Sequence, residues 1–129
     1  MSVPDPNGST PGAQQEVLDA SVIQGLRELG GEDDPGLLLE LVQLFLSDAP
    51  QRMREIEYGL EQGDWKLLER AAHTLKSASA NIGALGLSAI CKELEASARQ
   101  REAGPCNSLK RSSAECLARV EVALRQLHA

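Results

Sequence analysis

Apolar residues recur along the chain at steps of three and four positions, which is the spacing of one face of an α-helix. The first stretch with this spacing begins at Leu18 and ends at Gly30-Gly31, because paired glycines favour the end of a helix. Its apolar positions are Val22, Ile23, Leu26 and Leu29. We expect a short helix here, packed over one end of the domain.

A longer stretch follows Asp34 and Pro35, which fit a helix N-cap and a proline at the first helical position. Its apolar positions are Leu38, Leu41, Phe45, Ala49, Met53, Ile56 and Leu60. Pro50 lies within this stretch and removes one backbone hydrogen-bond donor. Because the apolar spacing stays in phase on both sides of Pro50, we expect a kink near it and not a break.

Three more helical stretches complete the pattern, separated by Gly63-Asp64, by a tight turn over residues 81–86 and by Gly104-Pro105. Their apolar faces are, in order, Leu68, Ala71, Ala72, Leu75, Ser79 and Ile82; Leu87, Ile90, Cys91, Leu94 and Ala98; and Leu109, Ser113, Cys116, Leu117, Val120, Leu124 and Leu127. Short connections make neighbouring helices antiparallel. The pattern predicts an all-α domain over residues 17–129, an antiparallel four-helix bundle with an additional short N-terminal helix. Residues 1–16, rich in proline and small polar side chains, are expected to form a flexible leader or linker.

Composition narrows the possible functions. The 129 residues, 42% of them hydrophobic, suffice for one domain, and a net charge of −6 argues against binding nucleic acid through overall positive charge. The three cysteines, Cys91, Cys106 and Cys116, match no zinc or disulfide spacing, so we expect free thiols, a reducing compartment and no metal site. With no bilayer-length apolar run and no signal pattern, we expect a soluble, cytoplasmic protein without direct membrane contact.

The third helix carries the candidate chemistry. At about 100° per residue, His73 points about 140° away from Leu68, on the outward face. Lys76, three residues further on, flanks the ring. The other outward residues are Lys66, Arg70, Ser77 and Ala80. An exposed imidazole among positive charges is a candidate reactive site, although Lys66 and Arg70 also fit a solvated face that pairs with Glu69.

The segment AHTLKSASANIGALGLSAICKELE, residues 72–95, resembles the histidine-containing phosphotransfer (HPt) domains of bacterial and fungal multistep phosphorelays, and a weaker likeness spans residues 18–127. The resemblance implies that His73 is phosphorylated, that Lys76 steadies the phosphoryl group and that Glu95 orients the other ring nitrogen. Glu95 is otherwise an ordinary residue at the boundary of the fourth helix. The family usually has glycine four residues after the histidine, where this chain has Ser77.

The resemblance implies a phosphocarrier that relays a phosphoryl group, in either direction, between receiver-domain aspartates. The chain shows no ATP-site pattern and is not expected to act as an enzyme or to need a cofactor, since the receiver brings its own Mg²⁺. The expected partners are response-regulator receiver domains and a hybrid sensor histidine kinase. We expect docking through Lys66, Arg70, Ser77 and Ala80, together with Leu41, Leu44 and Phe45 from the second helix. Periodicity alone leaves open which of the last three are buried.

The sequence allows one alternative class of function and argues against another. A non-catalytic HPt-like module that binds a partner without carrying phosphate is favoured only by Ser77. A metal or redox site formed by His73 and Cys91 is excluded because the two side chains point in opposite directions. The accessible third helix favours a monomer. A free-standing protein and the C-terminal domain of a membrane-bound hybrid kinase both fit the sequence.

Overall fold

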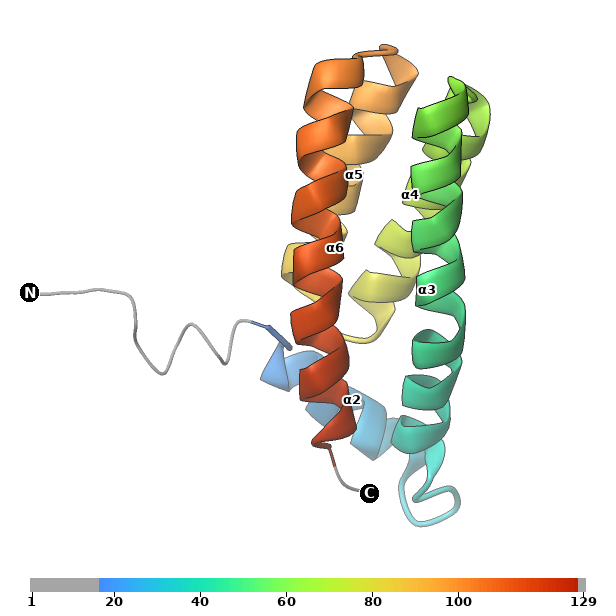
Figure 1. Cartoon of the computed structure of the whole chain (residues 1–129). Helices are drawn as coiled ribbons and strands as arrows, with labels where there is room; N and C mark the ends of the chain where they lie inside the picture. The colour runs from blue at the N-terminus through green and yellow to red at the C-terminus, as the bar shows by residue number, and fades with distance from the viewer. Residues whose placement is uncertain (1–16, 128–129) are drawn as a thin grey trace, which may run out of the picture.

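The computed structural model describes residues 17–127, and its five helices within that range confirm the all-α prediction. They are α2 (Ala20–Gly30), α3 (Leu37–Gln62), α4 (Trp65–Asn81), α5 (Leu85–Arg99) and α6 (Ala103–Arg125). Helices α3 to α6 form an antiparallel four-helix bundle, and α2 lies across the end where α3 begins and α6 ends (Figure 1). The expected leader, residues 1–16, lies outside the described residues.

The bundle is held by a leucine-rich core to which every helix contributes. Its largest fully buried apolar side chains are Leu38, Ile56, Leu68, Leu75, Leu87, Leu94, Leu124 and Val120. Helices α3 and α4 approach closely at Gly59, where a Cβ atom would lie 3.1 Å from the backbone nitrogen of Leu68. Glycine at this position therefore lets the helix that carries His73 pack tightly against α3.

Both ends of α4 are fixed. At its start, the Asp64 side chain accepts a hydrogen bond from the backbone N–H of Leu67 at 3.1 Å, as an N-cap should. At its end, Gly83 has a φ of +85°, and its carbonyl accepts a hydrogen bond from the backbone N–H of Asp19 at 2.8 Å. This bond ties the turn after α4 to the start of α2, so α4 is held as a rigid support.

Two predicted helix boundaries are wrong. Helix α3 begins at Leu37, after Gly36, because Asp34 and Pro35 belong to the preceding turn, in which Leu37 donates to the Asp34 carbonyl. Helix α5 ends at Arg99, and Gly104-Pro105 fall in the first turn of α6. A proline is tolerated there because the first N–H groups of a helix have no intrahelical acceptor.

The continuity of α3 is confirmed, and one predicted apolar position in α2 is wrong. Helix α3 continues through Pro50 without a break. Leu29, expected on the buried face of α2, is 74% exposed because that helix buries little more than Ile23.

All three cysteines are free thiols, as expected. Burial in the apolar interior, with a smaller contribution from Cys116, raises the pKa of Cys91 to about 12. The Cys91 thiol is therefore protonated at neutral pH. No helix between residues 17 and 127 is both long and apolar enough to cross a membrane.

Candidate functional site

His73 stands on the outward face of α4, with its side chain 58% exposed. The opposite face of the same helix is buried in the core through Leu68, Ala72 and Leu75, each 0% exposed. The rotation of the helix is the one that its apolar spacing predicts. An imidazole in this position is accessible to a second protein.

Glu95 of α5 contacts the ring from the bundle side. Its Oε2 atom lies 2.9 Å from His73 Nδ1, and Lys76 Nζ donates to its Oε1 atom at 2.7 Å. Because a carboxylate only accepts hydrogen bonds, Nδ1 of His73 carries the proton. The lone pair of the neutral ring is then on Nε2, and that atom can act as a nucleophile.

Glu95 is only 8% exposed, yet it is charged at neutral pH. Burial by itself raises the pKa of this carboxyl, but the hydrogen bonds and charges of Lys76 and His73 outweigh burial and bring the pKa below its usual value. Arg99 adds a further contact, with Nη2 3.2 Å from Glu95 Oε2. One carboxylate thus joins a histidine and two cations.

Arg99 and Glu69 belong to this cluster, although neither is among the site residues expected from the sequence. Arg99 Nε donates to Glu69 Oε2 across the α4–α5 interface at 2.8 Å. The spacing held a signal for both residues: Arg99 follows Glu95 by four positions and Glu69 precedes His73 by four, so each pair shares a helix face. The contact between the two helices is not encoded in that spacing.

Lys66 and Arg70 are exposed and form no ion pair with any residue of the range 17–127. The alternative expectation, that Lys66 and Arg70 pair with Glu69, is wrong: Glu69 pairs with Arg99. With Glu69, His73 and Glu95 they line a shallow hollow of about 390 Å³. Two unpaired cations therefore stand beside the imidazole.

The remaining α4 candidates differ in exposure. Ser77 is exposed and Ala80 is half-buried, so both leave the surface next to His73 free of large side chains. Lys76, expected to flank the ring from the surface, is half-buried and bound to Glu95. Among the described residues, no three His, Cys, Asp or Glu side chains are placed to hold a metal ion.

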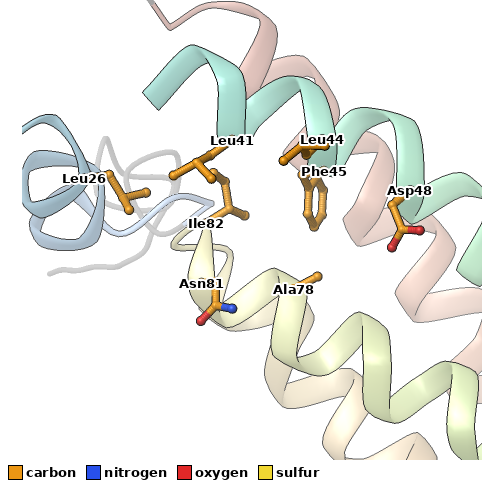
Figure 2. A pocket seen from close by; sticks show the side chains of 8 residues that line it. All are labelled: Leu26, Leu41, Leu44, Phe45, Asp48, Ala78, Asn81 and Ile82. Carbon is orange, nitrogen blue, oxygen red and sulfur yellow. The ribbon is translucent and has the colours of Figure 1, made fainter. Parts of the chain in front are cut away.

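The α3 candidates line a second hollow, an apolar groove of about 520 Å³ between α2, α3 and α4 (Figure 2). Leu44 is 66% exposed and Leu41 is half-buried, but Phe45 is only 5% exposed. Phe45 shares the buried face of α3 with Val42 and Ala49, and it lines the groove with its ring pointing from α3 into the space facing α4, so its exposed surface for docking is small. The full lining consists of Leu26, Leu41, Leu44, Phe45, Asp48, Ala78, Asn81 and Ile82.

Known proteins share this fold. The chain is similar to the solved histidine-containing phosphotransfer protein B (HptB) of Pseudomonas aeruginosa, with 34% identity and a TM-score of 0.78 over 85% of this chain and 92% of that one. The histidine-containing phosphotransfer protein MtHPt2 of Medicago truncatula is only 21% identical, but has the same fold, with a TM-score of 0.77 over 88% of this chain and 78% of that one.

Histidine-containing phosphotransfer protein 1 of Arabidopsis thaliana is 27% identical over 93 residues, 70% of this chain, and the match spans 60% of that protein's length. Because plant proteins match as well, the resemblance does not indicate a bacterial source. The model of the Hpt domain family matches residues 40–129, which include the whole histidine site. The chain belongs to the Hpt domain family.

Proposed function

We propose that this chain relays a phosphoryl group between the aspartates of receiver domains by carrying it on His73. The observation that supports this most directly is the exposed imidazole whose Nδ1 atom is bound by the buried carboxylate of Glu95 at 2.9 Å. This contact leaves Nε2 as the atom with a free electron pair. A positioned nucleophile without an ATP site is a phosphocarrier and not a kinase.

The transfer step needs no separate base. The lone pair of Nε2 attacks the phosphorus of a receiver phosphoaspartate, an N–P bond forms, and the P–O bond to the aspartate breaks to release its carboxylate. The ring already holds a proton on Nδ1, so it becomes a positively charged phosphoimidazolium. Glu95 stabilises that charge, and the reverse step returns the phosphoryl group to an aspartate.

Lys76 has a second role in this proposal. Its ammonium group is bound to Glu95 in the unphosphorylated protein, 2.7 Å from Oε1. When His73 carries a phosphoryl group, whose oxygens bear about two negative charges, we expect Nζ to turn toward those oxygens. Mg²⁺ comes from the acidic pocket of the receiver, and the chain itself needs no cofactor.

We propose that the receiver docks on the surface formed by Lys66, Arg70, Ser77 and Ala80 and on the groove beside it. The cations complement the acidic pocket of a receiver, and exposed Leu44 with half-buried Leu41 offers an apolar contact. Such a contact must form and release quickly, so we expect a small interface, micromolar affinity and a monomeric protein. A cytoplasmic location and a hybrid sensor histidine kinase as a further partner belong to the same proposal.

One experiment tests the proposed function. The intact chain is mixed with a phosphorylated, radiolabelled receiver domain, and the transferred label is tested for the acid lability and base stability of phosphohistidine. We expect label on the wild type and none on His73→Gln. Label that survives His73→Gln would refute the site. Absence of label with receivers that nevertheless bind would favour the non-catalytic module instead.

A further inference from the structure

Glu95 contacts three side chains, and the proposed transfer step uses only His73 and Lys76. The third, Arg99, places Nη2 3.2 Å from Oε2 of Glu95, the same oxygen that contacts His73 Nδ1. Its Nε atom donates to Glu69 on α4 at 2.8 Å. Arg99 therefore connects a carboxylate on the histidine's own helix to the carboxylate that contacts the ring.

These contacts leave the Glu95 carboxylate little freedom to rotate. Lys76 holds Oε1 at 2.7 Å, whereas Arg99 holds Oε2. A rotation of the carboxylate breaks at least one of these charge-assisted hydrogen bonds. Glu69 in turn fixes the Arg99 guanidinium, whose side chain is otherwise 58% exposed.

Charge balance gives Arg99 a second task. If Lys76 turns to the phosphoryl group, Glu95 loses one of its cations, while the phosphoryl oxygens bring about two negative charges to a side chain whose ring carries one positive charge. Glu95 is only 8% exposed, so water compensates its charge poorly. Besides the imidazolium ring itself, Arg99 is the cation that remains in contact with Glu95.

We propose that Arg99 is a positioning residue for His73: held by Glu69, it fixes the Glu95 carboxylate against Nδ1 and stays as its counter-charge when Lys76 leaves. The counter-charge role rests on the proposed function. The positioning role concerns the unphosphorylated protein and is tested separately.

The positioning role is measured on the intact, ¹⁵N-labelled chain by NMR of the His73 ring, assigned by its loss in His73→Gln. The neutral ring of the wild type is expected to carry its proton on Nδ1. Arg99→Gln shifts the population toward the Nε2–H form. Arg99→Lys restores part of the Nδ1–H population, because lysine keeps the positive charge but lacks a guanidinium that contacts Glu69 and Glu95 at once. Glu69→Gln gives a smaller shift in the same direction. The matched control, Arg111→Gln, removes an exposed cation from α6 and leaves the ring as in the wild type.

The counter-charge role is measured as the rate of phosphoryl transfer from a phosphorylated receiver domain. Arg99→Gln is expected to be about tenfold slower, by analogy with the loss of about 10–100-fold that follows removal of a residue orienting a metal-binding histidine. Arg99→Lys should recover part of the rate, and Arg111→Gln should equal the wild type. Equal melting temperatures, expected because the Arg99 side chain is mostly exposed, separate these effects from unfolding.

The two readouts have different consequences. An unchanged Nδ1–H population in Arg99→Gln overturns the positioning role, and an unchanged rate overturns the counter-charge role. If neither the wild type nor Arg111→Gln takes up a phosphoryl group, the proposed function fails. The tautomer population then still decides whether Arg99 positions the ring.

Discussion

Substituting Glu95 by glutamine isolates the charge that faces the reactive ring. Glutamine has nearly the same shape and keeps one oxygen that can accept the Nδ1–H bond of His73. It removes the negative charge shared by His73, Lys76 and Arg99, whose nitrogens lie 2.9, 2.7 and 3.2 Å from the carboxylate. The substitution therefore separates ring orientation, which is partly kept, from charge stabilisation, which is lost.

The size of the effect follows from Coulomb's law. Phosphorylated His73 is an imidazolium, and two unit charges about 4 Å apart attract by about 4 kcal/mol at an effective dielectric constant of about 20. The net loss is smaller because Lys76 and Arg99 share the carboxylate and the hollow is open to water. A net loss of about 1.4 kcal/mol corresponds to a tenfold change in an equilibrium constant, so we expect the equilibrium constant for forming phosphohistidine from the receiver phosphoaspartate to fall about tenfold.

The assay is the distribution of label between a receiver domain and this chain at equilibrium, at fixed ionic strength. Glu93→Gln is the control because Glu93 is an exposed carboxylate on the same helix. We expect the control to match the wild type, and the equilibrium constant worked out from the distribution of label to be about tenfold lower for Glu95→Gln. Equal labelling of Glu95→Gln and the wild type would contradict the claim that Glu95 stabilises the phosphorylated ring.

Three further outcomes are expected. Leu75→Ala should lower the free energy of unfolding by about 2–5 kcal/mol in denaturant titrations, since Leu75 is 0% exposed. Leu29→Ala should change it little, because Leu29 is 74% exposed. Equal effects would contradict the rotation of α4 that buries Leu75. Cys91, whose pKa is raised to about 12 by burial, should react with a thiol reagent at pH 8 far more slowly than half-buried Cys116 until the chain is unfolded. The pKa of Glu95 in the folded chain lies below its ordinary value of 4.5, so the unfolded chain binds this proton more readily. The contribution of the Glu95 charge to stability is therefore full above pH 4.5 and is lost as the pH falls through the folded-state pKa. On acidification, Glu95→Gln should lose less free energy of unfolding than the wild type does.

Much of the fold was predictable from the sequence because the core is built from strictly periodic positions. Leu68, Leu75 and Leu94 lie on predicted apolar faces and are fully buried. The errors lie where periodicity carries no information. Asp34 and Pro35 have the residue types of a helix start, but their backbone groups belong to a turn. Leu29 continues the apolar spacing of α2 but is exposed, because that helix covers only one end of the bundle.

The site was predictable where its residues share α4, and less so where it crosses to α5. The outward direction of His73 follows from its position relative to Leu68 on one helix. The contact of Arg99 with Glu69 depends on the relative height of two helices, which spacing within each helix does not specify. The exposure of Phe45 could not be predicted either, because its position on a helix face does not determine how much of the ring is accessible from the groove.

The most direct test of the central claim is to identify the ring nitrogen that carries phosphorus. The chain is phosphorylated by a receiver domain, and ¹⁵N–³¹P coupling in the His73 ring is measured by NMR. We predict a phosphorus bonded to Nε2, with Nδ1 still protonated and bound to Glu95. Phosphorus on Nδ1 or on any other side chain would contradict the account.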